Sequence, residues 1–304
     1  MNAVAVPVFF IGCVQSSEVA LRALMARPEI SVKGVLCMRK NTYNSDFVDL
    51  SEMAAENCIP IFYAEHMNQT ELAEILRASA AEITFAVGWS RLLDPDIISI
   101  PRYGTIGFHP SALPQNRGRH PLIWALALGL EKTASTFFMM EKGADTGPII
   151  NQKEIDININ DNAQSLYQKV LEIVPKQINM IIDDLIAGQL NGSPQDHSLS
   201  NYWRKRSTPD GRLDWRMSAS AVYNLTRALT RPYTGAEFYY GNHLVKVWRC
   251  ELVTDKVPFN AEPGKVLSVD VSGPVIKTGL GREGGAVRLS ETDPFLNLRT
   301  GDYL

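Results

Sequence analysis

The chain has 304 residues, of which 45% are hydrophobic and 21% are charged, and its formal net charge is −3. This length predicts two domains or one large one, with a core that needs no disulfide or metal to hold it. The small negative charge argues against a nucleic-acid-binding surface. No apolar run approaches the roughly 20 residues of a membrane helix, so we expect no membrane span.

Cysteine usage points to a reducing compartment. The four cysteines, Cys13, Cys37, Cys58 and Cys250, lie far apart and form no C-x-x-C pair. We therefore expect reduced, mostly buried thiols in a cytoplasmic protein, and no metal site. The apolar residues 1–10 lack a basic leader and a cleavage site, so they are interpreted as the first strand and not as a signal peptide.

The first part of the chain alternates between strand-like and helix-like patterns. The predicted strands are 4–12, 32–37, 59–63 and 82–87, and the predicted helices are 16–25, 46–57 and 71–80. The first helix has Ser16 or Ser17 as its expected cap. Such alternation predicts a parallel-rich, Rossmann-like sheet. The turn after the first strand contains one glycine, Gly12, which argues against a dinucleotide site.

The middle of the chain continues the pattern and then becomes polar. Residues 104–108 and 135–140 are predicted strands, 118–128 a helix, and 163–188 a long amphipathic helix broken or kinked at Pro175. A polar segment rich in Ser, Asn, Pro and Asp follows. We therefore expect a first domain over 1–190, a linker over 191–211 and a second domain over 212–304.

The second domain has a different character. Residues 219–229 form a predicted helix, and the predicted strands are 237–240, 244–252, 264–271, 275–278 and 286–290. This pattern indicates a small β-rich domain. The G-x-G-x-x-G match at 279–284 precedes a strand and not a helix, so it predicts a loop.

One His and one Asp stand out as candidates for chemistry. His109 ends the strand over 104–108, and Asp145 lies in a glycine-rich turn after the strand over 135–140. We expect both to project from strand ends at one edge of the sheet, where layered α/β folds place their active sites. A His–Asp pair there could transfer protons near neutral pH.

The residues around this pair resemble the formyltransferases that use 10-formyltetrahydrofolate. The matching stretches are HPSALP at 109–114, RG at 117–118 and DTG at 145–147. PDG at 209–211, LDW at 213–215, RA at 227–228 and PYTGA at 232–236 resemble the C-terminal domain of longer members and point to the sugar-modifying branch. The resemblance implies a Rossmann-like catalytic domain followed by a small OB-like, β-rich domain.

The resemblance also implies an activity. The expected reaction is N-formylation of a nucleotide-linked amino sugar, with 10-formyltetrahydrofolate as cosubstrate. The resemblance places this reaction in the synthesis of cell-surface glycans such as lipopolysaccharide. His109 would donate a hydrogen bond or a proton to the formyl oxygen, which gains negative charge in the reaction. Asp145 would orient His109 and help to accept the amine proton. The family has an Asn two residues before the His, where this chain has Gly107. We expect a gap there, filled by water, a backbone N–H or another side chain, of which Asn116 is the nearest amide.

Further site residues follow from the same resemblance. The expected folate contacts are Gly88, Ser90, Arg91, Leu93, Gly143 and Ala144. The expected substrate contacts are Gly107, Ser111, Arg117, Gly118 and His120.

Three alternatives remain open at this point. A methionyl-tRNA formyltransferase shares the motifs, although the net charge disfavours tRNA. A non-catalytic folate- or sugar-nucleotide-binding protein would explain Gly107. A nicotinamide oxidoreductase is disfavoured by the missing early glycines. The expected partners are small molecules, and a homodimer is one option for the oligomeric state.

Overall fold

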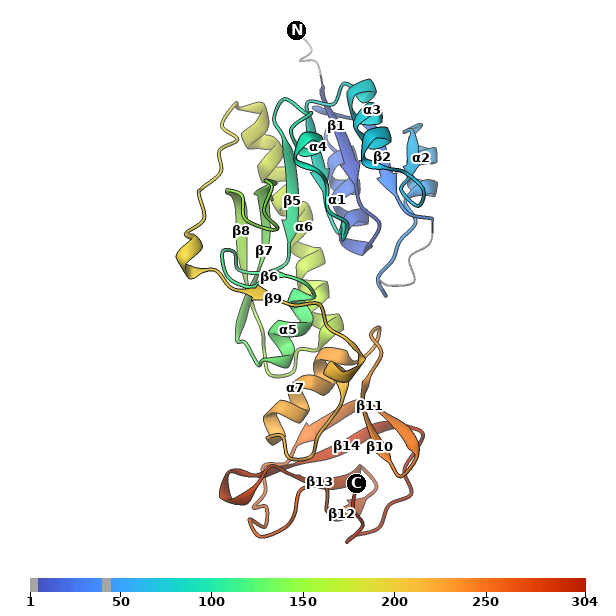
Figure 1. Cartoon of the computed structure of the whole chain (residues 1–304), viewed down its shortest axis with the longest axis vertical. Coiled ribbons are helices and arrows are strands. Elements are labelled where there is room, and N and C mark those ends of the chain that lie inside the picture. The colour runs from blue at the N-terminus through green and yellow to red at the C-terminus, as the bar shows by residue number, and fades with distance from the viewer. Residues whose placement is uncertain (1–4, 40–44) are drawn as a thin grey trace. The chain divides into compact units, whose positions relative to one another are not determined.

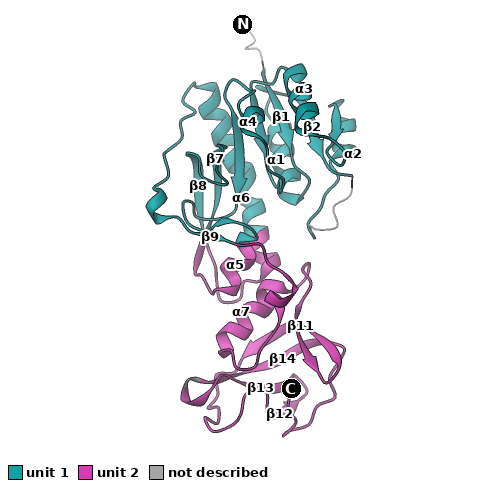
Figure 2. Ribbon diagram, in the orientation of Figure 1, with its two compact units in different colours: residues 1–121, 133–155, 168–203 teal, residues 122–132, 156–167, 204–304 magenta. Residues whose placement is uncertain are grey.

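The chain is organised as two compact units (Figures 1 and 2). The computed structural model describes residues 5–39 and 45–304. Unit 1 comprises Met1–Pro121, Thr133–Ile155 and Gln168–Trp203, and unit 2 comprises Leu122–Lys132, Asp156–Tyr167 and Arg204–Leu304. Within the described residues, no helix combines the length and apolar character needed to cross a membrane.

Unit 1 contains a seven-stranded sheet in the order β3-β2-β1-β4-β5-β7-β8. The strands are β1 Val6–Ile11, β2 Ile30–Cys37, β3 Ile61–Tyr63, β4 Ile83–Ala86, β5 Thr105–His109, β7 Lys132–Met139 and β8 Ile149–Asp156. The pairs among β3, β2, β1, β4 and β5 are all parallel. The predicted parallel-rich, Rossmann-like sheet is therefore confirmed.

Strand β7 corrects one expectation. It pairs with β5 in the antiparallel sense, with His109 opposite Thr136 and Ile106 opposite Met139. The end of β7 therefore lies beside the start of β5, at the edge away from His109. His109 and Asp145 do not come from strand ends at one edge, so the turn after β7 must bring Asp145 back to His109.

The helices of unit 1 bury apolar residues against the sheet. They are α1 Gln15–Met25, α2 Ser51–Glu56, α3 Gln69–Ser79, α4 Pro95–Ile98 and the larger part of α6 Ala163–Ile186, whose first residues belong to unit 2; α5 Pro121–Ala127 belongs to unit 2 except for its first residue. Leu72 and Leu76 of α3 and Ile97 of α4 join one core cluster with Phe9 and Ile11 of β1. Such burial is the main favourable contribution to folding.

Three predicted helices differ in detail. Helix α1 begins one residue early, with Val14 at the N-cap, and Ser17 accepts the Val14 N–H at 3.0 Å from inside the helix. The predicted helix over 46–57 begins only at Ser51, because the backbone of Asp46 and Val48 bonds to the chain around Cys13. Helix α6 was expected to break or kink at Pro175.

Helix α6 is one continuous helix with Pro175 inside it, so it does not break there, and a kink at Pro175 stays a prediction. Its buried apolar residues recur every three or four positions on both sides of the proline; they include Leu166, Val170, Val174, Ile178, Ile182 and Leu185. Pro175 removes one backbone hydrogen bond of the helix. The packing of this long apolar stripe outweighs that loss, so the helix continues. In Figure 1, α6 lies behind β7 and β8.

Unit 2 contains a five-stranded antiparallel sheet in the order β10-β11-β14-β13-β12. The strands are β10 Ala236–Tyr240, β11 His243–Leu252, β12 Val266–Asp270, β13 Gly273–Thr278 and β14 Gly285–Asp293, and helix α7 spans Ala219–Leu229. The predicted β-rich second part of the chain is confirmed. Gly279 and Gly284 flank a loop with a single short 3-10 turn, Gly281–Glu283, as expected.

The segment predicted as a linker is structured in its first half. Ser193 exchanges two backbone hydrogen bonds of 2.8 Å with Ile149 of β8. Strand β9, Tyr202–Trp203, pairs in parallel with β6, Arg117–Gly118. The boundary between the compact units falls after Trp203. The three-part division of the chain at 190 and 211 stays a prediction.

Candidate active site

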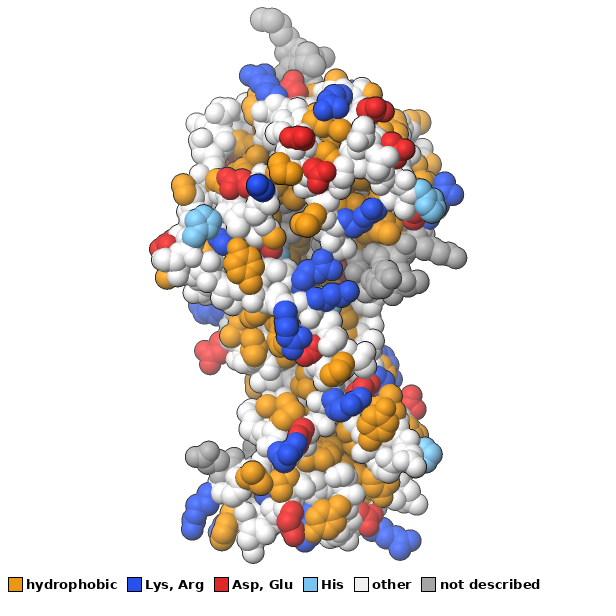
Figure 3. All heavy atoms as spheres, viewed as in Figure 1, with side chains coloured by type: hydrophobic (Ala, Val, Ile, Leu, Met, Phe, Trp, Pro, Cys, Tyr) orange, Lys and Arg blue, Asp and Glu red, His pale blue; other side chains and the backbone are white. Residues whose placement is uncertain are grey.

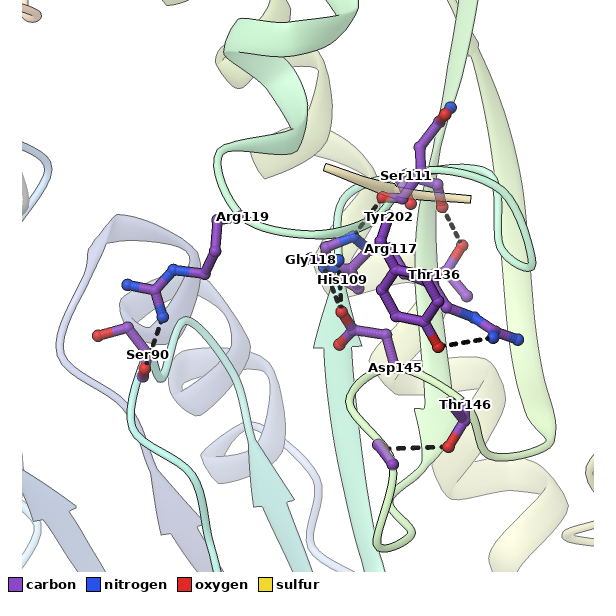
Figure 4. Close-up of polar contacts among 12 residues, drawn as sticks. Ser90, His109, Ser111, Arg117, Gly118, Arg119, Thr136, Asp145, Thr146 and Tyr202 are labelled. Atoms are coloured by element: carbon purple, nitrogen blue, oxygen red, sulfur yellow. Dashed lines mark hydrogen bonds and ion pairs between the residues drawn. The ribbon is translucent and has the colours of Figure 1, made fainter. Parts of the chain in front are cut away.

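His109 is the last residue of β5, and its side chain is 7% exposed. Its Nε2 lies 2.9 Å from the carbonyl oxygen of Asn116. Because a carbonyl oxygen only accepts, this bond assigns the ring hydrogen to Nε2. The other nitrogen, Nδ1, faces Asp145 with its Oδ2 at 3.7 Å (Figure 4). In this tautomer Nδ1 carries the lone pair and is turned toward the Asp145 carboxylate.

Asp145 reaches His109 through the excursion between β7 and β8. The Met139 N–H donates to the Pro148 carbonyl at 2.8 Å and closes the base of this excursion. At its tip, the Gly118 N–H donates to Oδ2 of Asp145 at 3.0 Å. The carboxylate thus receives a backbone donor from the loop that follows β5 and faces the imidazole at the same time.

The backbone around this pair is held in uncommon conformations. Asn116, His120 and Asp145 all have positive φ, of 62°, 56° and 58°. Residues other than glycine pay roughly 1–2 kcal/mol for the left-handed region, so the surrounding contacts must hold them there. Such residues concentrate at functional sites, which agrees with the positions predicted from the motifs.

Arg117 and Gly118 support the loop from inside. Arg117 is 1% exposed, and its guanidinium donates to the Tyr202 hydroxyl, to Oε1 of Gln195 and to Nδ1 of His197. Gly118 has a φ of 101°, and a Cβ there would lie 2.3 Å from the carbonyl oxygen of Trp203. The guanidinium of Arg117 thus bonds to other residues of the protein. Direct contact of Arg117 with a substrate stays a prediction.

Ser111 and His120 lie on the same loop as His109. Ser111 is fully buried, and its hydroxyl donates to the Gln115 carbonyl at 3.2 Å. Its own carbonyl accepts from the Thr136 hydroxyl at 2.6 Å, which ties the loop to β7. His120 is half-buried immediately before α5. The substrate contacts expected of Ser111 and His120 stay predictions.

Gly107 corrects the expectation of a gap. It lies two residues before His109 on the same face of β5 and pairs with Phe138 of β7. A Cβ at Gly107 would lie 2.9 Å from Cζ of Phe138 and 2.9 Å from Cγ of Met140. Apolar side chains therefore occupy the space where the family's Asn would begin. The substrate contact expected of Gly107, and the group that replaces the family's Asn, stay predictions.

A small pocket lies beside the segment after β4. Its cavity volume is only about 20 Å³, and its lining includes Met67, Trp89, Arg91 and Leu93 together with the polar Asn68 and Gln69. The indole Nε1 of Trp89 is buried without a hydrogen-bond partner. A small, mixed polar and apolar pocket with an unused indole donor could contact the edge of a heteroaromatic ring that carries acceptors.

The other residues expected to contact folate lie outside this lining. Gly88 has a φ of 66° and packs so closely that a Cβ would lie 2.1 Å from Val14. The Ser90 carbonyl accepts from Nη1 of Arg119 at 2.9 Å, which joins this segment to the loop after β5 (Figure 4). Gly143 and Ala144 are exposed in the turn that carries Asp145. Their contacts with folate stay predictions.

Gln195 is a residue of the site that sequence reasoning missed. It is 7% exposed and bonds to Arg117 and to the turn of Asp145. It lies in a polar segment without apolar periodicity, so no local pattern marks it as buried.

Comparisons with solved structures find proteins that share the fold of this chain. An N-formyltransferase from Helicobacter canadensis, described in complex with folinic acid and dTDP-3-aminofucose, is 17% identical with a TM-score of 0.70, covering 94% of this chain and 99% of that one. WlaRD, described as a sugar 3N-formyl transferase in the presence of dTDP and 5-N-formyl-THF, is 17% identical with a TM-score of 0.70, covering 97% and 100%. The methionyl-tRNA formyltransferase from Clostridium thermocellum is 17% identical with a TM-score of 0.59, covering 83% and 96%.

Two family models match the chain itself. The formyl transferase model matches residues 22–181, which include His109 and Asp145. The model of the formyl transferase C-terminal domain matches residues 205–292, which include α7 and most of the second sheet. Since the first match alone covers more than half of the chain, the protein belongs to the formyl transferase family and is a formyl-transferring enzyme.

Proposed function

We propose that this enzyme transfers the formyl group of 10-formyltetrahydrofolate to the amine of a nucleotide-linked amino sugar. The observation that carries the transfer chemistry is the His109–Asp145 pair, with Nδ1 of His109 turned toward Oδ2 of Asp145 and Nε2 tied to a carbonyl. The sugar acceptor is supported by two structures that match nearly the whole chain, one described in complex with dTDP-3-aminofucose and the other described as a sugar 3N-formyl transferase.

The reaction requires the free amine to form a bond with the formyl carbon while the bond from that carbon to the folate nitrogen breaks. One proton must leave the amine, and one must reach the departing nitrogen. Nδ1 of His109 is the exchangeable position, because the Asn116 carbonyl holds the hydrogen on Nε2. In its protonated form His109 stabilises the negative charge that develops on the formyl oxygen.

Asp145 has two tasks in this proposal. Its carboxylate faces Nδ1 of His109 and favours the ring orientation and charge needed for the proton transfer. It can also accept the amine proton, directly or through water. The Gly118 N–H fixes Oδ2 on one side, so the carboxylate enters the reaction already oriented.

The folate would bind with its pterin ring in the pocket beside Trp89, Arg91 and Leu93. The unused indole donor of Trp89 and the apolar side chains of Met67 and Leu93 support this assignment. Asn116 is the candidate amide for the task that Gly107 cannot perform, and the bond from its backbone carbonyl to Nε2 of His109 supports this choice. Both the proposed pterin pocket and Asn116 belong to unit 1.

A cytoplasmic location, no nucleic-acid partner and a role in cell-surface glycan or lipopolysaccharide synthesis complete the proposal. They follow from the sugar acceptor, whose nucleotide-linked form is a small cytoplasmic metabolite. The formal net charge of −3 supports small-molecule partners over a polyanion, although basic side chains group over the middle of the face shown in Figure 3. A homodimer remains one option for the assembly.

A screen for turnover tests the proposed function. The enzyme is incubated with 10-formyltetrahydrofolate and a panel of nucleotide-linked amino sugars, beginning with dTDP-linked 3-amino sugars. We expect one member of the panel to gain the mass of one formyl group, with stoichiometric release of tetrahydrofolate. If the folded enzyme formylates no amino sugar of the panel, whichever ring position carries the amine, the proposal of a sugar acceptor is contradicted.

A further inference from the structure

Gln195 joins three parts of the site that are far apart in the sequence. Its side-chain amide donates to the carbonyl of Asp145 at 3.0 Å and to the carbonyl of Gly147 at 2.6 Å. Its side-chain oxygen accepts from Nη2 of Arg117 at 2.6 Å. The side chain is therefore bonded on both sides, to the turn that carries Asp145 and to the loop after His109.

We infer that Gln195 is a positioning residue that holds the Asp145 carboxylate against His109. The inference rests on the proposed function and concerns how the pair is kept in place. Gln195 touches no reacting atom in this account. It acts through the backbone of the turn between β7 and β8.

The backbone conformation of Asp145 explains why such a support is needed. With a φ of 58°, Asp145 occupies a region that a free turn would leave. The direction of its carboxylate depends on that conformation, since a rotation of the backbone swings Oδ2 away from His109. The two bonds from Gln195 grip the turn at Asp145 and at Gly147, so they resist this rotation.

Gln195 is itself held firmly. Two residues before it, Ser193 pairs with Ile149 of β8, and seven residues after it, β9 pairs with β6. Arg117 fixes its side-chain oxygen and also bonds to Tyr202 of β9. The segment from Ser193 to Trp203 thus forms a strap that ties the Asp145 turn to the Arg117–Gly118 strand.

A purely structural role for Gln195 makes a different prediction from a positioning role. Gln177 offers the comparison, because it is a fully buried glutamine of the same unit. It bonds to Ser135 and to Asn151, on the side of the sheet that α6 covers, and to no residue of the site. Loss of either amide should lower stability, but only the loss of Gln195 should disturb the His109–Asp145 pair.

The test compares Gln195→Glu with Gln177→Glu in the full chain. Gln195→Glu keeps an acceptor for Arg117 and replaces the donors to the two carbonyls by an oxygen. We expect kcat to fall by about 10- to 100-fold with KM for both substrates within about threefold, as for a reacting group that is misplaced. Gln177→Glu, or Gln177→Leu if the first variant does not fold, should keep kcat within about threefold at a temperature where it remains folded.

A second readout does not depend on the acceptor. The ring ¹⁵N signals of His109, assigned with His109→Ala, should shift in Gln195→Glu toward their positions in Asp145→Asn, and should stay in place in the Gln177 variant. If the wild-type enzyme formylates no amino sugar, the proposed function fails while this measurement still decides the role of Gln195. A folded Gln195→Glu or Gln195→Leu enzyme with unchanged His109 signals would overturn the inference.

Discussion

His109 contacts two partners of different kinds, and the difference determines what each ring nitrogen can do. The Asn116 carbonyl bonds to Nε2, and the Asp145 carboxylate faces Nδ1 at 3.7 Å. This separation exceeds a hydrogen bond, so the pair can tighten when a substrate binds. In the proposed mechanism the proton moves through Nδ1, while Nε2 stays bonded to the Asn116 carbonyl.

Removal of either member of the pair should abolish most turnover. We expect His109→Ala and Asp145→Asn each to lower kcat by about 10²–10⁴-fold, the contribution typical of a positioned acid–base group. Steady-state kinetics with the acceptor identified in the screen gives kcat, and thermal unfolding confirms that each variant is folded. Glu141→Gln is the matched control, because Glu141 is an exposed acid of the same excursion. A folded variant with near wild-type kcat would remove that residue from the mechanism.

Gly107 gives a second prediction at this scale. Gly107→Asn restores the family's residue, but its Cβ meets Phe138 and Met140 at 2.9 Å. We expect a loss of about 1–3 kcal/mol in the free energy of unfolding, as for an overpacked core, and no rise in kcat. Gly107→Ala serves as control, since it adds the Cβ without the amide. A rise in kcat for Gly107→Asn alone would show that the amide finds room and that the position lacks only a donor.

The residues of the pair could be predicted from the sequence, whereas their support could not. His109 and Asp145 belong to short motifs with fixed spacing. Gln195 lies in a polar segment, and its burial depends on a backbone pairing between residues 149 and 193 that leaves no local pattern. The filled space beside Gly107 likewise depends on the register of β5 against β7.

Strand direction decides how the elements assemble the site. Because β7 is antiparallel to β5, the chain between β7 and β8 must bring Asp145 back to His109. There the carboxylate accepts a hydrogen bond from Gly118 of β6, which pairs with β9. Apolar runs predicted both strands correctly, but the direction of a strand is not contained in its own sequence. The predicted helix over 46–57 was too long for a similar reason, since its first residues pair with the chain near Cys13.

Gly118 is the position where this arrangement tolerates least change. Gly118→Ala should weaken the β6–β9 pair and the Asp145 contact together, because its Cβ would lie 2.3 Å from the Trp203 carbonyl. We expect lower kcat and lower thermal stability, measured by steady-state kinetics and calorimetry. Gly188→Ala is the control: its φ is also positive, at 67°, but no atom lies within 4 Å. It should cost only about 1–2 kcal/mol and leave kcat unchanged. Equal kcat values for Gly118→Ala and Gly188→Ala would contradict a link between the β6–β9 pair and the position of Asp145.

At the scale of the whole molecule, the division into a parallel-rich unit and an antiparallel unit followed from alternating patterns of apolar residues. The strands and the helix α7 of unit 2 were predicted within a few residues. The strap was not predicted, because residues 193–203 carry no apolar periodicity and their place in unit 1 depends on backbone pairing with distant strands.

The burial of the cysteines gives a prediction that covers both units. Burial raises the pKa of the Cys37 thiol to about 12 and that of the Cys250 thiol to about 11. A raised pKa lowers the thiolate fraction at a given pH, so these thiols should be inert near pH 8. Cys58 is exposed, whereas Cys13 is buried. A thiol reagent should therefore label one of the four cysteines rapidly in the native protein and all four after unfolding. Rapid native labelling of Cys37 or Cys250 would contradict the packing described.

The central claim is transfer of a formyl group to an amino sugar, and one competition measures it directly. The enzyme receives 10-formyltetrahydrofolate labelled with ¹³C in the formyl group, together with equal concentrations of the sugar nucleotide from the screen and methionyl-tRNA. The account predicts that the label appears as a formamide of the sugar nucleotide in the ¹³C NMR spectrum, and that Asp145→Asn suppresses it. Label on the tRNA, or label that stays on the folate or is released only as formate, would contradict it.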